Sequence, residues 1–290
     1  MRSPDVQVGR LDTRLPRRTW SMRRAGRPLV LCIVSLMIIA PIYLNVVNAL
    51  LPLKYRLAYP PPLYPKDPTL NAFSLAIRQG SMIRYFVNST VVATAITIGE
   101  VTTAALAAYA FTFLEFPFRR ALFWAIVGSG LVPFEAIVIG NFHTVARLHW
   151  IDSYPALIVP FLASSFGVFL LSRAFRTVPV DLIGAAQLDG CGHLRILRYV
   201  VVPVARPAIG ALGVLSFLGA WNQYLWPLLV TNRPDRRTIP IGLRQLAGGE
   251  LNSATVLSAA AVLTLIPVLG LLAVFNRQLV RGLTAGFVGK

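Results

Sequence analysis

The sequence predicts an all-α integral membrane protein with six transmembrane helices and a two-helix loop on the cytoplasmic side. Of the 290 residues, 56% are hydrophobic and only 13% are charged, and the mean hydropathy is +0.64. This composition is too apolar for a soluble chain of this length. The apolar residues also gather in stretches of about 20, which is the length that a helix needs to cross roughly 30 Å of hydrocarbon. A transmembrane barrel would instead show alternating segments of about 10 residues.

Six stretches qualify as spanning helices. Four contain no Asp, Glu, Lys or Arg, and the other two contain one acid each, Glu100 and Glu135. The predicted spans lie at about residues 29–51, 85–113, 121–142, 154–171, 207–230 and 254–275. They form one transmembrane domain at 29–276, with an Arg-rich leader at 1–28 and a tail at 277–290. The leader is long and no A-x-A-like site follows the first apolar stretch, so we expect a retained anchor rather than a cleaved signal peptide.

The positions of the basic residues predict the orientation. A net charge of +17 would indicate a polyanion partner in a soluble protein. With six spans both termini share one side, and 18 of the 28 Lys and Arg fall on that side against 10 on the other. Because basic residues stay on the cytoplasmic side during insertion, both termini are predicted to be cytoplasmic. Topology thus explains most of the excess charge, and no nucleic acid is expected as a partner.

The cytoplasmic connection at residues 172–206 is predicted to contain a short helix and a tight turn. Pro179 can open a helix, and Asp181 in its first turn complements the positive end of the helix dipole. Asp189 and Gly190 then predict a reversal, because both residue types tolerate the left-handed conformation that a tight turn needs.

A second helix is predicted from His193, ended by Pro203 and Pro207. Its apolar residues recur on one face at Leu194, Leu197 and Val201. A helix, a turn and another helix that project between two spans would fit a socket on another protein. An ordinary amphipathic loop at the membrane surface is an equal alternative.

The run Gly-Ala-Ala-Gln-Leu-Asp-Gly at 184–190, with Val-Val-Val-Pro at 200–203, resembles the EAA loop of bacterial binding-protein-dependent ATP-binding-cassette (ABC) importer permeases. That loop carries Glu-Ala-Ala, two variable residues and Asp-Gly, then a hydrophobic stretch ending in Pro. Other matches favour the carbohydrate-uptake branch and its MalG-like half. They are Ala-Tyr-Ala at 108–110 before Phe-Pro at 116–117, Trp-Asn at 221–222 with Trp-Pro at 226–227, Thr-Ile-Pro-Ile-Gly-Leu at 238–243, and Gly-Leu-Thr-Ala-Gly at 282–286.

The resemblance, which covers nearly everything after residue 29, implies the type I ABC importer permease fold. It also implies an inner-membrane component that forms half of a translocation pathway for a sugar or sugar-like polyol, working by alternating access in the bacterial cell membrane. The implied partners are a second homologous permease, two ABC ATPase subunits, an extracytoplasmic solute-binding protein and the lipid bilayer. The chain has no G-x-x-x-x-G-K-[ST] motif. It is therefore not expected to be an enzyme or to hold a cofactor, and ATP and Mg would bind in the partner ATPases.

The resemblance further implies that the loop couples transport to ATP hydrolysis. The residues expected to act in coupling are Asp181, Gly184, Ala185, Ala186, Asp189, Gly190 and Pro203. The sequence departs from the pattern at Gly184, where the family has Glu. Asp181 lies one turn earlier on the same helix face, and we expect it to supply part of the missing charge.

The predicted solute pathway combines an acid with a polar and aromatic cluster. Charged groups inside the bilayer usually face a cavity or a partner helix. Glu135 follows Pro133, which should open the helix nearby. Glu135 could therefore either face a cavity or form a structural hydrogen bond. For Glu100 the structural role is favoured. The cluster combines aromatic faces with amides that could bind sugar hydroxyls, although Trp near a span end is often a belt or packing residue. It comprises Trp221, Asn222, Gln223 and Tyr224.

Other classes of function find less support. We expect no catalytic set and no metal site, because His143, His149 and His193 fall on different sides of the membrane in this topology. Within the family, a glycerophosphodiester or a sugar phosphate is the alternative solute, which the basic external loop at 233–237 would suit. Outside the family, the alternatives are a stand-alone six-span secondary carrier, an intramembrane enzyme, and a membrane anchor that binds a polyanion through the leader.

Overall fold

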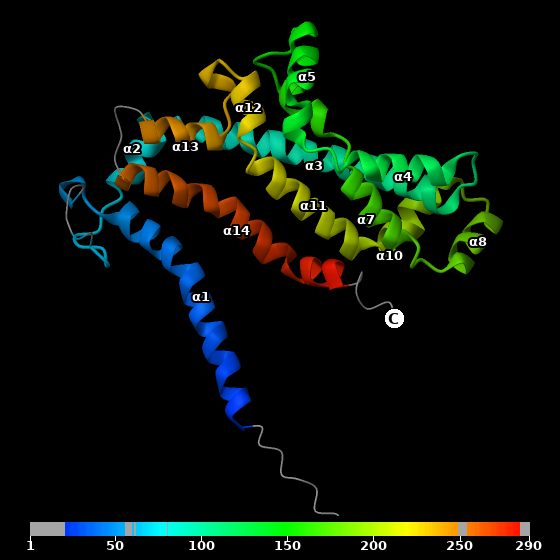
Figure 1. Ribbon diagram of the computed structural model, residues 1–290, viewed down its shortest axis with the longest axis horizontal. Helices are drawn as coiled ribbons and strands as arrows, with labels where there is room; N and C mark the ends of the chain where they lie inside the picture. Colours follow the sequence, from blue (N-terminus) through cyan, green and yellow to red (C-terminus); the bar gives the residue numbers. More distant parts are fainter. Residues whose placement is uncertain (1–20, 56–59, 61, 80, 249–253, 285–290) are drawn as a thin grey trace, which may run out of the picture. The chain divides into compact units, whose positions relative to one another are not determined.

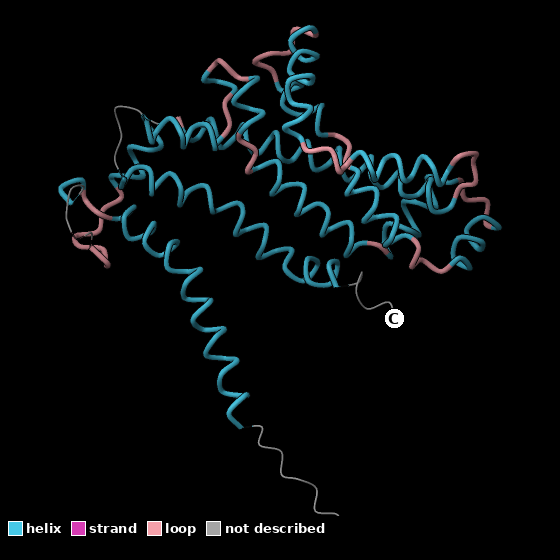
Figure 2. Tube along the Cα trace, in the orientation of Figure 1, coloured by secondary structure: helices cyan, strands magenta, loops and turns pink. Residues whose placement is uncertain are grey.

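The computed structural model describes residues 21–55, 60, 62–79, 81–248 and 254–284. All regular structure in these ranges is helical (Figure 2), which confirms the predicted all-α class. The chain divides into two compact units, residues 1–44 and 45–290. The first 20 residues of the leader and the tail beyond residue 284 lie outside the described residues, so the predictions made for them stay predictions.

The first unit contains most of helix α1 (Ser21–Leu50). The stretch Pro28–Leu50 carries no charged side chain, and its 23 residues are enough to cross a bilayer. It corresponds to the first predicted span.

Three long helices form the centre of the second unit: α3 (Met82–Phe113), α11 (Arg206–Trp221) and α14 (Ala254–Thr284). Helix α11 packs against both α3 and α14, and α7 (Ser165–Phe175) packs against α3 (Figure 1). Small residues allow the α3–α7 contact, because a Cβ at Gly167 would lie 3.0 Å from the Cβ of Ala104. Such close approach of small residues is typical of helix packing in membranes.

The remaining helical segments of the second unit are shorter. They are η1 (Leu53–Tyr55), α2 (Asn71–Gln79), α4 (Arg119–Ser129), α5 (Phe134–Arg147), α6 (Tyr154–Ile158), η2 (Val159–Phe161), α8 (Val180–Leu188), α9 (His193–Ile196), η3 (Leu197–Val201), α10 (Val202–Val204), α12 (Leu225–Val230), η4 (Pro234–Arg236) and α13 (Ile239–Gly248). Helices α8 and α10 lie at one end of the bundle, and α2 and α13 lie at the other (Figure 1).

Three of the predicted spans are broken instead of continuous. Helices α4 and α5 meet at 95°, and the segment Tyr154–Phe161 meets α7 at 46°. The fifth span, expected at 207–230, ends at Trp221, and a new helix begins at Leu225. In the described residues three helices are long enough to cross a membrane, or up to six if each bent pair counts as one span.

Local chemistry explains the breaks. Pro133 is the extended residue that precedes α5, and Ser164 caps α7 by accepting a hydrogen bond from the Gly167 N–H at 3.1 Å. Pro227 in the first turn of α12 has no N–H to continue a helix from α11. Hydropathy does not reveal the first two interruptions, because Arg119–Ser129 with Phe134–Arg147, and Tyr154–Phe161 with Ser165–Phe175, are each long and apolar enough as a pair to cross a membrane.

A group of hydrogen bonds, here called the Asn88 clamp, closes the end that carries α2 and α13. The buried Asn88 amide donates to the carbonyls of Asp235 and Arg237, both at 2.9 Å, and accepts from the Tyr154 hydroxyl at 2.8 Å. The Asp152 carboxylate accepts from the backbone N–H groups of residues 232 and 233 at 2.6 and 2.8 Å. The loop after α12 is therefore fixed to α3 and α6.

Candidate functional site

The two-helix loop has the turn that its Asp-Gly pair predicts. Helix α8 ends at Leu188, and Gly190 adopts a left-handed φ of +74°. The Gly190 N–H donates to the Gln187 carbonyl at 3.0 Å, and the Cys191 N–H donates to the Ala186 carbonyl at 2.9 Å. This pair of bonds is a Schellman motif, in which glycine avoids the steric penalty of the left-handed conformation. The turn therefore depends on glycine at position 190.

One side of the loop packs into the bundle. Ile183 of α8 is 6% exposed, and Ile196 and Val201 are fully buried against Phe175 of α7. The Tyr109 hydroxyl of α3 lies 3.1 Å from Nδ1 of His193, which joins the second helix of the loop to the core. The loop is therefore packed against α3 and α7.

The exposed residues of the loop include three large apolar side chains among polar and charged ones. Val180 is 76% exposed, Leu188 is 91% exposed and Leu194 is 72% exposed. The sequence places Leu194 on one helix face with Leu197 and Val201, but only Leu197 and Val201 are buried. The segment Leu197–Val201 is a π-helix, whose wider turn brings Ile196 and Val201 onto one face and leaves Leu194 outside it.

The second helix also ends differently from the prediction. Pro203 lies inside α10, which continues to Val204, and Pro207 lies in the first turn of α11. Proline is tolerated there because the first N–H groups of a helix have no partner within the helix. The helical segment His193–Val204 meets α11 at 87°, so the loop turns sharply into the fifth span.

The predicted coupling residues lie on and around α8. Ala185, Asp189 and Gly190 are exposed, as is Asp181 in the first turn, while Ala186 is half-buried. Gly184 is half-buried too, but a Cβ built there meets no atom within 4 Å. Gly184, which stands where the family has Glu, therefore has open space beside it instead of a contacting side chain.

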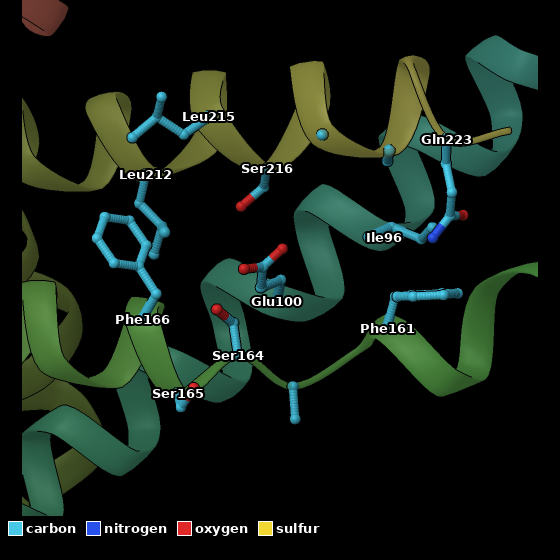
Figure 3. A pocket seen from close by; sticks show the side chains of 13 residues that line it. Ile96, Glu100, Phe161, Ser164, Ser165, Phe166, Leu212, Leu215, Ser216 and Gln223 are labelled. Atoms are coloured by element: carbon cyan, nitrogen blue, oxygen red, sulfur yellow. The ribbon is translucent and has the colours of Figure 1, made fainter. Parts of the chain in front are cut away.

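A cavity of about 400 Å³ lies between α3, the η2–α7 segment and α11. Its polar side chains come from three segments and are Glu100, Ser164, Ser165, Ser216 and Gln223. Figure 3 shows the Glu100 carboxylate and the Ser216 hydroxyl pointing toward one another across this space. None of the lining residues is Lys or Arg, so the cavity offers a negative charge and hydrogen-bond acceptors.

Two of these groups lack a hydrogen-bond partner within the described residues. They are the hydroxyl of Ser216, whose residue is 8% exposed, and the side-chain oxygen Oε1 of Gln223. A buried polar atom without a partner is costly by about 1–3 kcal/mol, so such atoms are rare in folded proteins. A ligand with hydroxyl groups would satisfy both.

The predicted solute-pathway residues separate in the structure. Gln223 lines the cavity. Trp221 is 3% exposed, stacks on Phe217 with ring centroids 5.6 Å apart, and meets Phe86 edge-on at 5.5 Å. These contacts give Trp221 a packing role in the core.

The other three pathway residues lie outside the cavity lining. The Asn222 amide donates to the Leu218 carbonyl at 2.9 Å and so ends α11, while Tyr224 is 38% exposed. Glu135 is exposed in the first turn of α5.

Sequence reasoning did not select Ser164 or Ser216 for the site and favoured a structural role for Glu100. A signal existed, because Ser216 and Gln223 are seven positions apart and so share a helical face. The neighbouring segments that complete the cavity could not be read from that spacing.

Taken together, an all-helical bundle with broken spans, a partly open cavity with polar side chains and a projecting two-helix loop define a multi-pass membrane permease. Residues 100–284 match the family described as "Binding-protein-dependent transport system inner membrane component". The chain belongs to this family, and it is a permease subunit of the inner membrane, not a catalytic subunit.

Curated relatives and solved structures agree with this assignment. The chain is 37% identical to the sn-glycerol-3-phosphate transport system permease protein UgpE of Yersinia enterocolitica over 68% of this chain and 70% of that protein. It is 33% identical to UgpE of Rhizobium meliloti over 88% of this chain and 94% of that protein. Its fold matches a chain of a bacterial ABC transporter involved in the import of the acidic polysaccharide alginate, with a TM-score of 0.81 and 20% sequence identity. The match covers 91% of this chain and 99% of that chain.

Proposed function

We propose that this chain forms half of the translocation pathway of an ATP-driven importer for a sugar or sugar-like polyol. It would work beside a second homologous permease, with both termini in the cytoplasm. Two ABC ATPase subunits would bind ATP and Mg, and an extracytoplasmic protein would deliver the solute. Transport would proceed by alternating access.

The observation that carries this proposal is the two-sided character of the two-helix loop. Its inner side is anchored through Ile183, Ile196 and the Tyr109–His193 contact, whereas Val180, Leu188 and Leu194 are exposed on the other side. Exposed apolar residues in such number indicate a docking surface. An ATPase subunit that binds there could move the loop and, through its packed side, α3 and α7.

The chemistry of the cavity favours a neutral, hydroxyl-rich solute on this half of the pathway. The Glu100 carboxylate and the Gln223 side-chain oxygen accept hydrogen bonds, and the Ser216 hydroxyl can donate or accept one. Solute hydroxyls supply matching donors, while an anion in the same space would be repelled by Glu100.

A phosphorylated polyol is the second candidate, because the UgpE relatives are named for sn-glycerol-3-phosphate. The phosphate group would then have to bind on the partner permease, with its polyol part facing this cavity.

The test uses the complex co-purified with its ATPases and partner permease, reconstituted in vesicles with the cognate binding protein at saturation. We expect Glu100→Gln to lower the solute transport rate by about 10-fold or more, since a hydrogen bond to a charged group contributes roughly 1.5–3 kcal/mol and each 1.4 kcal/mol is about 10-fold. Glu135→Gln removes the same charge outside the cavity and serves as the matched control. Loss of transport in E135Q alone would assign the pathway to Glu135 and refute the cavity.

A panel of neutral sugars, sugar alcohols and glycerol-3-phosphate in the same assay identifies the solute class. Transport that persists without ATP, or a purification that recovers no ATPase subunit, would overturn the importer assignment itself.

A further inference from the structure

A second cavity, here called the arginine pocket, lies at the end of the bundle that carries the two-helix loop. It has a volume of about 370 Å³ and is formed by the end of α3, the start of α4 and the end of α7. Four guanidinium groups line it, two from α4 and two from the α7 end: Arg119, Arg120, Arg173 and Arg176. Arg119 is half-buried and the other three are exposed to solvent, and four like charges around one small space favour the binding of an anion.

The chain itself supplies no such anion. No Asp or Glu lines the pocket, and none of the four arginines forms an ion pair within the described residues. Arg119 donates to the Leu114 carbonyl at 2.8 Å, and the Arg173 guanidinium lies 5.4 Å from the centre of the Phe169 ring. These contacts orient two of the side chains but leave the charge unbalanced.

Buried hydroxyl groups point to a ligand independently of the charge. Ser172 is 1% exposed, and its hydroxyl has no hydrogen-bond partner within the described residues; the same holds for the Thr112 hydroxyl. Both residues line the pocket. A phosphate group would accept hydrogen bonds from these hydroxyls and from the guanidinium groups, whose planar geometry suits phosphate oxygens.

Exposed apolar residues of the same segment indicate where that phosphate comes from: Trp124 lines the pocket, and Phe118 and Leu122 are neighbours in sequence of the lining residues Arg119 and Phe123. Phe118 is 84% exposed, Trp124 is 63% exposed and Leu122 is 48% exposed. Exposed aromatic residues beside arginines at the end of a helical bundle are typical of the membrane interface. Basic pockets between transmembrane helices on the cytoplasmic side bind anionic lipid headgroups.

We propose that the arginine pocket binds a phosphate-bearing anion, and that this anion is the headgroup of an anionic lipid. The phosphate lies among the guanidinium groups and the Ser172 hydroxyl, and the acyl chains lie along Phe118 and Trp124. The site is separate from the Glu100 cavity and does not depend on the solute that is transported.

The test measures lipid retention by native mass spectrometry on the full chain in complex with its co-expressed partners. The complex is offered equal amounts of phosphatidylglycerol and phosphatidylcholine, with and without inorganic phosphate. The variant is Arg173→Gln/Arg176→Gln, which leaves the Arg119 hydrogen bond in place. Arg147→Gln/Arg244→Gln, in which two exposed arginines outside the pocket are replaced, is the control with the same change in charge.

We expect the wild type and the control to retain phosphatidylglycerol in preference to phosphatidylcholine. The pocket variant should lose about 30-fold in apparent affinity, because each arginine near an anionic lipid contributes about 5-fold. Equal retention of the two lipids by the wild type, or equal loss in both variants, would overturn the proposal.

Two further results would assign the pocket differently. Displacement of the lipid by inorganic phosphate at equimolar concentration would overturn the lipid as the source of the anion. Loss of the ATPase subunits from the pocket variant, with lipid retention unchanged, would make the arginines a protein-docking surface and overturn lipid binding.

Discussion

Replacement of Gly190 by Ala tests whether the turn between α8 and α9 controls coupling. A Cβ at this position meets no atom within 4 Å, so the perturbation acts on the backbone alone. The φ of +74° places the residue in the left-handed region, which costs an L-residue roughly 1–2 kcal/mol. The population ratio of the Schellman turn to competing conformations should therefore fall by a factor of about 5 to 30.

The assay is solute-stimulated ATP hydrolysis by the reconstituted complex. We expect Gly190→Ala to reduce the stimulation, and Gly190→Asn to reduce it less, because Asn tolerates the left-handed region better than other residues. Gly192→Ala is the control: this residue has φ −71° and ψ 163°, which any residue adopts, and its Cβ also meets nothing within 4 Å. Equal behaviour of G190A and G192A would refute the reasoning.

Two predictions concern stability and can be checked by thermal unfolding of the purified chain in detergent. Gly242→Ala places a Cβ on the ring of the buried Tyr85 and should destabilise the folded chain by about 1–3 kcal/mol. Gly219→Ala is the control, because its Cβ meets nothing within 4 Å and should not destabilise the fold. Similar melting temperatures for the two variants would contradict this prediction. Trp226→Phe removes the hydrogen bond from the buried indole N–H to the Ala156 carbonyl at 2.8 Å. It should lower the stability of the fold by about 1–3 kcal/mol, since that carbonyl loses its partner. An unchanged melting temperature would show that another donor replaces the indole.

The sequence was sufficient for features that depend on local composition. Apolar length located the three long helices at Pro28–Leu50, Met82–Phe113 and Ala254–Phe275. The Asp189-Gly190 pair located the turn, because a left-handed residue after a short helix has few chemical solutions. The family resemblance added the loop's proposed role, which no hydropathy argument contains.

Features that depend on tertiary neighbours were not predictable in the same way. Glu100 faces a cavity because η2, α7 and α11 happen to leave space beside it, and the sequence gives no sign of that arrangement. The outward position of Leu194 follows from the π-helix at Leu197–Val201, which shifts the packed face away from the 3.6-residue period. The breaks near Pro133 and Pro227 were marked by proline, but hydropathy windows average over single residues.

The Asn88 clamp determines where this subunit can come apart. One amide group holds α3, the start of α6 and the loop at 235–237 together, and separation of any of these would strand several buried hydrogen-bonding groups at once. We therefore expect the three segments that meet at Asn88 to move together. We propose that a passage opening at this end forms between this chain and a neighbouring permease, so a covalent link placed across the clamp should not block it.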